Sequence, residues 1–190
     1  MTHVDQVGAG HPELDQFLHD AFEPALNAYP REPDAALAVA GVGPKEGLPQ
    51  RWQTHSPLDF ALRNAGRGGD GRLTFMGFEY FGWYDLVRMV SDFLLHPGHH
   101  HDGDAKRQFM DGCRAVLGSE LNFSDRLGAL YYLTGLRWCM ILLNKFLPER
   151  IAHRQVAGDV HQLASEFTRQ LWKADLLLTI LKSNKGNVID

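Results

Sequence analysis

The C-terminal part of the chain carries apolar residues at helical spacing, and this pattern restricts the fold more than any other feature of the sequence. In the segment 159–182, one helix face would hold Val160, Leu163, Phe167, Leu171, Ala174 and Leu178. Asp159, followed three residues later by Gln162, resembles a capping box at the start of this helix. An apolar face of this length has to be buried against other elements, so the pattern predicts a helix packed into a core.

The same spacing recurs over much of the chain. It predicts further helices over residues 12–22, 84–95, 105–117 and 124–146. Pro12 opens the first of these helices, and Pro24 and Pro30 limit it. Ser124 is predicted to cap the last one, and Pro148 to end it. The expected fold class is therefore mainly α, with five or six helices.

Other segments lack helical spacing. Residues 1–11 are predicted to form a disordered tail. Residues 30–57 contain five prolines and three glycines and are predicted to form an irregular connection, with a short helix at 35–40. Residues 72–80 follow a glycine-rich turn and are rich in β-formers, which indicates a short strand. Because a chain of 190 residues is too short for two ordinary domains, residues 12–190 are predicted to form a single domain.

Composition narrows the classes of partner and compartment. The formal net charge is −4 and the basic residues form no long run, so neither a nucleic acid nor a membrane is expected as a partner. No stretch reaches the roughly 18 apolar residues that a membrane span requires, and residues 1–10 contain no apolar signal-peptide core. Cys113 and Cys139 lie in apolar helical patterns and are predicted to be buried thiols, which favours a reducing compartment, the cytoplasm.

The residue pattern that indicates chemistry lies just before the predicted strand. Asp59 is followed five residues later by Asn64. Phosphoryl transfer to a hydroxyl needs an acid that orients and deprotonates the hydroxyl, and an oxygen ligand for the metal that holds the phosphates. An Asp and an Asn on one short loop can divide these two tasks. By itself the spacing is common, and a local Asx turn is the alternative interpretation of either residue.

A second motif follows this loop, and the order and separation of the two motifs resemble those of a known protein family. The second motif comprises Phe78, Glu79, Tyr80, Gly82 and Trp83. Together with Asp59 and Asn64, it resembles the catalytic loop and the following strand of the aminoglycoside phosphotransferase and choline kinase superfamily. The resemblance implies a kinase-like C-terminal lobe with a small β-hairpin. It also implies transfer of the γ-phosphoryl group of ATP, with Mg²⁺, to a hydroxyl of a small polar acceptor. In that activity Asp59 would be the catalytic base and Asn64 a metal ligand.

Three departures from the family pattern limit this expectation. First, Gly77 occupies the position of the family's magnesium-binding Asp. Second, the catalytic loop differs, because Arg63 precedes the Asn where relatives usually carry Gly and Pro57 stands where a His is frequent. Third, residues 1–50 show no strand pattern of a nucleotide-binding N-terminal lobe. The chain is therefore expected to be truncated and impaired in isolation, with a partner chain supplying that lobe or with a homo-oligomer. It is expected not to bind ATP tightly and to expose apolar surface beside Asp59.

Two alternatives concern the missing carboxylate. Glu79 lies two residues beyond Gly77, on the same face if the segment is a strand, so it is a candidate substitute metal ligand. Its other interpretation is a structural Glu that hydrogen-bonds to the loop. Within a strand, replacement of Gly77 is expected to cost little stability, unless a bulge or a close backbone contact requires glycine there.

Two further hypotheses come from other classes of protein. The first is a non-catalytic kinase-like domain that binds a small molecule or a partner protein. The second is a metal-binding module built on His96, His99, His100 and His101. Because these histidines lie in a Gly- and Asp-rich loop, a solvated polar loop is the preferred interpretation.

Overall fold

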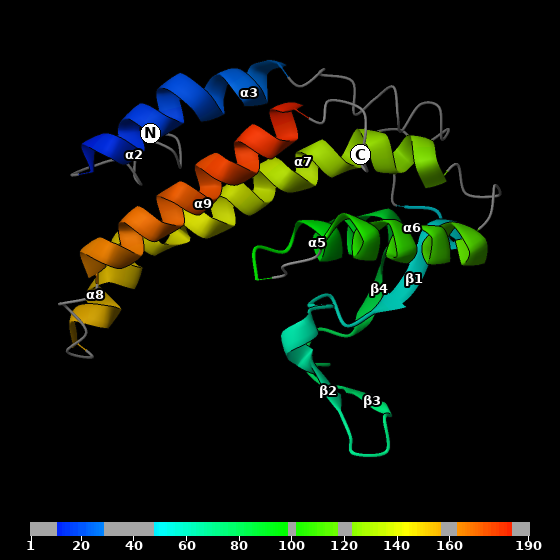
Figure 1. Cartoon of the computed structure of the whole chain (residues 1–190). Coiled ribbons are helices and arrows are strands. Elements are labelled where there is room, and N and C mark those ends of the chain that lie inside the picture. Colours follow the sequence, from blue (N-terminus) through cyan, green and yellow to red (C-terminus); the bar gives the residue numbers. More distant parts are fainter. Residues whose placement is uncertain (1–10, 29–47, 99–101, 118–122, 157–162, 184–190) are drawn as a thin grey trace. The chain divides into compact units, whose positions relative to one another are not determined.

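The computed structural model describes residues 11–28, 48–98, 102–117, 123–156 and 163–183 (Figure 1). These residues are mainly helical with two small antiparallel sheets, which confirms a mainly α fold, whereas the kinase-like lobe stays a prediction. Contacts group the chain into two compact units, one of residues 1–30 with 135–185 and one of residues 31–134 with 186–190. The single domain predicted for residues 12–190 stays a prediction.

Helices make up the described part of the first unit. Their bounds are α2 (Pro12–Phe17), a π-helical turn (Leu18–Phe22), α3 (Glu23–Ala28), the second half of α7 (Phe123–Leu143), a 3-10 turn (Asn144–Phe146), α8 (Pro148–Val156) and α9 (Leu163–Ser183). In Figure 1, α9 runs alongside α7 and the helical segment 12–28. Apolar residues at helical spacing fill the space between these helices: Leu14, Leu18, Ala25, Leu136, Cys139, Leu143, Phe146, Ala174, Leu178 and Leu181. Burial of these side chains is the main stabilising contribution to the unit.

One proline prediction is wrong. Pro24 does not limit the first helix, because the Glu23 N–H donates to the Leu18 carbonyl across the wider π-helical turn. The backbone is helical from Pro12 to Ala28 without a break, so Pro24 lies inside one continuous segment, and the widened turn accommodates its missing N–H. The helical run that begins with α7 ends at Phe146 and Leu147 is extended, as predicted from Pro148. Pro148 is also the first residue of α8, a helix that the sequence did not predict, because proline is favoured at the first helical position.

The second unit combines short strands with helices. Its elements are a 3-10 turn (Gln50–Trp52), β1 (Gln53–Ser56), a second 3-10 turn (Leu62–Asn64), β2 (Ala65–Arg67), β3 (Leu73–Phe75), β4 (Gly82–Asp85), α5 (Leu86–Leu95), α6 (Gly103–Leu117) and the first half of α7. β1 pairs with β4, placing Gln53 opposite Asp85, and β2 pairs with β3, placing Ala65 opposite Phe75. The strand predicted over 72–80 ends at Phe75.

A buried ion pair connects three elements of the second unit. Arg126 of α7 donates from Nη2 to both carboxylate oxygens of Asp85, each at 2.7 Å. Asp85 also caps α5, since its Oδ1 accepts the Val87 N–H at 2.9 Å. The guanidinium lies over the Trp52 ring, 4.4 Å from its centroid, and Arg126 is only 2% exposed. Sequence patterns gave no sign of this pair, because its members are 41 residues apart.

The two cysteines differ in their surroundings. Cys139 is buried and donates to the Ala174 carbonyl, and burial raises the pKa of its thiol to about 12. Cys113 is only partly buried, so its predicted place in the core is wrong, although burial also raises the pKa of its thiol. It lies on the amphipathic α6, whose polar face is wide.

Some predictions fall outside the described residues. They are the tail over residues 1–10, the short helix at 35–40, the capping box at Asp159 and Gln162, and the histidines at 99–101. His11, the last residue of the predicted tail, is partly buried and packs edge-on against Phe146 and Phe167. Among the helices that are described, none combines the length and the hydrophobicity of a membrane-crossing segment.

Candidate functional site

The loop between β1 and β2 is held by closely spaced backbone hydrogen bonds. The Asp59 N–H donates to the Pro57 carbonyl at 2.7 Å, and the Ala61 N–H donates to the Asp59 carbonyl at 2.9 Å. The hydroxyl of the buried Ser56 accepts the Leu58 N–H at 3.1 Å. These bonds fix the backbone on both sides of Asp59, so the position of its side chain is set by a rigid support.

Leu58, which directly precedes Asp59, has a strained backbone. Its φ is 60°, and among the described residues it is the only non-glycine with positive φ. For a residue with a branched side chain this conformation costs on the order of 1–2 kcal/mol. Stored strain of this kind is concentrated at functional sites. The strain therefore supports a functional role for the loop that carries Asp59.

We expect Leu58→Gly to be more stable than Leu58→Ala by about 1 kcal/mol. Both substitutions remove the same apolar side chain beyond Cβ, but only glycine adopts positive φ without a steric penalty. Urea unfolding of the two variants measures the difference. Equal free energies of unfolding, or a more stable alanine variant, would show that residue 58 has an ordinary backbone conformation in solution.

Arg63 connects Asp59 to His96. Its Nη2 donates to Asp59 Oδ2 at 2.6 Å, and its Nη1 donates to His96 Nε2, also at 2.6 Å. Asp59 and Arg63 are both substantially exposed, whereas His96 is buried, 33 residues further along the chain. One carboxylate oxygen of Asp59 is therefore engaged, and the other is the oxygen that could accept a proton from a hydroxyl.

Asn64 lies against both Asp59 and Gly77. The Asn64 Nδ2 donates to the backbone carbonyl of Asp59 at 2.8 Å, and the backbone carbonyl of Asn64 accepts the Met76 N–H at 2.8 Å. A Cβ atom built on Gly77 would lie 3.1 Å from Asn64 Nδ2 and 3.3 Å from its Cγ. The β2–β3 hairpin produces this approach, because Asn64 directly precedes β2 and Gly77 follows β3 by two residues. Asn64 thus contacts both the backbone of Asp59 and residue 77, where the sequence analysis had expected an acid.

Glu79 does not join this group. It is exposed, and it makes no hydrogen bond or ion pair in the described part of the chain. The argument that placed it on the same face as Gly77 is wrong, because residues 76–81 lie outside β3 and Gly77 has a φ of 81°. Its role as a metal ligand stays a prediction. In the ranges that the structure describes, no three His, Cys, Asp or Glu side chains are close enough to hold a metal ion.

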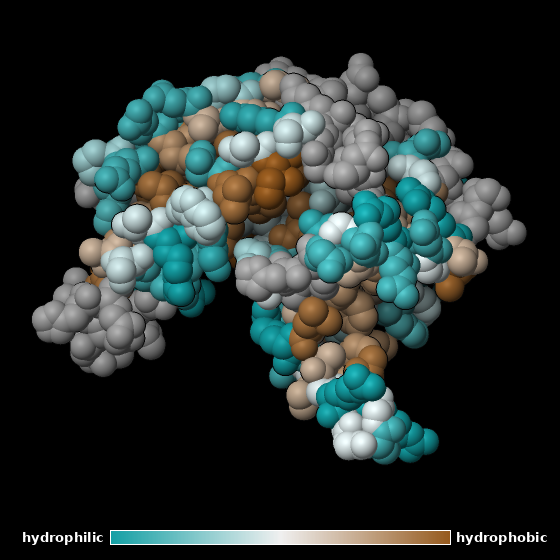
Figure 2. Space-filling view, viewed as in Figure 1, coloured by the Kyte–Doolittle hydropathy of each residue, from teal (hydrophilic) through white to brown (hydrophobic). Residues whose placement is uncertain are grey.

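Large apolar side chains are exposed around the hairpin and the segment that follows it. They are Leu62, Leu73, Phe75, Met76, Phe78, Tyr80, Phe81 and Trp83. Figure 2 shows hydrophobic atoms at the surface in the part of the molecule that Figure 1 labels β2 and β3. This agrees with the expectation of exposed apolar surface near Asp59.

Neither the positive φ of Leu58 nor the contact of His96 with Arg63 was expected from the sequence. No pattern signals a positive φ at a leucine, so Leu58 could be recognised only from the backbone. His96 was considered as a metal ligand within a histidine run, and its contact with Arg63 depends on the tertiary fold.

Comparison of the chain with protein-family models, with curated proteins and with solved structures gives no match in any of the three.

Proposed function

We propose that the second unit carries a phosphotransferase-type site in which Asp59 orients and deprotonates a hydroxyl and Asn64 supplies a metal ligand. The reaction is transfer of the γ-phosphoryl group of ATP to a small polar acceptor. The observation that supports the proposal best is the approach of Asn64 to Gly77, since an acid at residue 77 would share one site with Asn64 and with the loop of Asp59. The family resemblance supplies the identity of the reaction.

The oxygen atoms present fit a magnesium site only in part. Asn64 uses its Nδ2 to hold the Asp59 carbonyl, which leaves its Oδ1 as an oxygen of the kind that Mg²⁺ binds. Gly77 provides no carboxylate. With one amide oxygen and one ion-paired acid, the site would hold Mg²⁺ weakly, and it is the metal ion that would neutralise the phosphate charge, which together with positioning supplies most of the catalysis in phosphoryl transfer. The chain is therefore proposed to be an impaired member of this class.

Gly77→Asp is expected to create a site for Mn²⁺ or Mg²⁺. The new carboxylate would project toward the Asn64 amide, and hard cations prefer such oxygen sites. The exception made for a position that requires glycine applies here, because residue 77 has positive φ and its Cβ would crowd Asn64. We expect the variant to be less stable by about 1–3 kcal/mol, yet to bind Mn²⁺ at least tenfold more tightly than the parent. Water-proton relaxation with Mn²⁺ and urea unfolding give the two quantities.

Gly77→Asn is the matched control, because it has nearly the same shape without the charge. It should gain no Mn²⁺ affinity. Asn64→Ala in the Gly77→Asp background should abolish the gain. If the Asp and Asn variants bind Mn²⁺ equally, or if the gain survives without Asn64, these positions do not form a metal site and the proposal fails.

A non-catalytic binding domain is the second candidate, and the exposed apolar residues around β2 and β3 favour it. This surface would suit a partner chain that supplies an N-terminal lobe, or a second copy of the chain. For either candidate we place the protein in the cytoplasm, because Cys113 and Cys139 are both free thiols.

A further inference from the structure

A second candidate site lies within the first unit, away from the residues discussed so far. Two adjoining hollows lie between the helical segment 12–28 and α9, and their volumes are about 600 and 420 Å³. Glu13, Thr168 and Leu171 line both hollows, which therefore form one continuous groove. We call it the α2–α9 groove.

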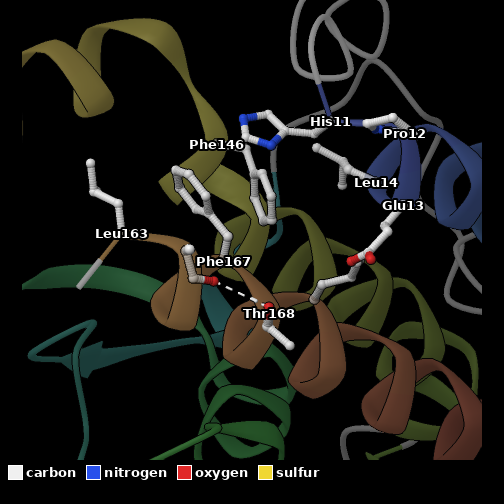
Figure 3. A pocket seen from close by; sticks show the side chains of 10 residues that line it. His11, Pro12, Glu13, Leu14, Phe146, Leu163, Phe167 and Thr168 are labelled. Carbon is white, nitrogen blue, oxygen red and sulfur yellow. Dashed lines mark hydrogen bonds between the residues drawn. The ribbon is translucent and has the colours of Figure 1, made fainter. Parts of the chain in front are cut away.

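The larger hollow has an aromatic wall (Figure 3). Phe146 and Phe167 stack with centroids 4.6 Å apart, and the His11 ring meets both edge-on at 5.1 and 4.9 Å. Leu14 and Leu163 complete the apolar lining and are themselves buried. The wall is held in place by packing, so it offers a preformed surface for a flat apolar ring.

The smaller hollow is acidic. It is lined by the exposed carboxylates of Glu13, Asp20 and Asp175, and by Trp172, which is 60% exposed. Among the described residues, none of the three acids forms an ion pair and no Lys or Arg lines either hollow. Lys182 is held by the Ala21 carbonyl, to which its Nζ donates at 3.2 Å. Carboxylates beside an indole ring suit an ammonium group, which gains from both the charges and the ring face.

The geometry points to a binding site for an amphipathic amine, with its apolar ring against Phe146 and Phe167 and its ammonium group near Glu13, Asp20 and Asp175. Along α9, Phe167 and Trp172 are five residues apart, or about 7.5 Å of helix axis. The ring and the ammonium group of the ligand are therefore joined by a short alkyl chain. The charge of the three acids selects a cationic end over an anionic one.

Two fluorescent probes test the proposal on the full chain. Dansylcadaverine carries an aromatic ring and a primary ammonium group, and the dansyl amide of aminohexanoic acid replaces the ammonium group by a carboxylate. We expect dansylcadaverine to bind with increased, blue-shifted emission, and the carboxylate probe to bind at least tenfold more weakly. Three exposed charge interactions of ordinary strength, each about two- to threefold in affinity, account for that ratio.

Two variants separate the contributions of the two hollows. Ala164→Leu fills the larger hollow from an exposed position of α9, where leucine is a good helix former, and should abolish binding of both probes. The triple variant Glu13→Gln, Asp20→Asn, Asp175→Asn should weaken dansylcadaverine binding about tenfold and bring the two probes to equal affinity. Glu149→Gln, an exposed change on α8 outside both hollows, should alter neither affinity. Circular dichroism checks that each variant is folded.

Three outcomes would overturn the inference. They are no binding of dansylcadaverine to the parent chain, equal binding of the two probes, and unchanged binding in folded Ala164→Leu. Because the groove residues lie in the first unit and the Gly77 experiment concerns the second, either proposal can fail without the other.

Discussion

Arg126→Met is expected to destabilise the second unit by about 3–5 kcal/mol. The substitution keeps an apolar chain of similar length but leaves the Asp85 carboxylate, only 17% exposed, without its partner. Removing one member of a buried ion pair is costly because the remaining charge stays desolvated. The cation–π contact with Trp52 is lost as well. Urea unfolding followed by tryptophan fluorescence measures the effect.

Two controls separate the buried charge from the loss of a side chain. In the double variant with Asp85→Asn, much of the loss should be recovered, because no unpaired charge remains and asparagine still caps α5. Arg114→Ala removes an exposed pair with Asp111 and should cost less than about 0.5 kcal/mol. If Arg126→Met costs no more than Arg114→Ala, the buried pair does not stabilise the fold.

Gly135→Ala is expected to destabilise the first unit by about 1–3 kcal/mol, although alanine is the better helix former. A Cβ on Gly135 would clash with Leu181 Cδ1 and would lie 2.9 Å from the Leu181 Cγ. Leu181 is 2% exposed, so its side chain cannot turn away without leaving the core. Overpacking of this kind outweighs the roughly 1 kcal/mol of helix propensity that alanine adds. Thermal and urea unfolding of the variant give the sign and the size.

Gly112→Ala on α6 is the matched control. It is exposed, and a Cβ there would have no neighbour within 4 Å. The same substitution should therefore stabilise the protein by about 1 kcal/mol through helix propensity alone. Stabilisation by both substitutions would mean that α7 and α9 do not approach closely at Gly135.

The roles of the candidate site residues stay predictions, and their surroundings were expected only in part. Asp59 and Asn64 were selected by their spacing and by the resemblance, and the hairpin that separates Asn64 from Gly77 was expected in outline. The position at which β3 ends was not expected. A glycine at residue 77 is compatible both with a strand and with a turn, and only its φ of 81° distinguishes the two. The inference that Glu79 shares a face with Gly77 depended on that undecided point.

The sequence by itself determined the elements whose pattern is local. The apolar spacing of α5, α6, α7 and α9 gave helices within a few residues of their observed ends, because each helix face is encoded within its own segment. Prolines were ambiguous even locally, since Pro24 lies inside the helical segment 12–28 whereas Pro148 both follows the end of one helical run and begins α8.

Only the tertiary structure decided which distant residues meet. The pairing of Arg126 with Asp85, the contact of Arg63 with His96 and the close approach of Gly135 to Leu181 each join separate elements. A local pattern records which face of an element is apolar, but the register and separation of two packed elements depend on the shapes of all the side chains between them. For that reason the sequence indicated the loop that could carry chemistry, whereas the oxygen atoms available there, and the groove on the other unit, became apparent only in the fold.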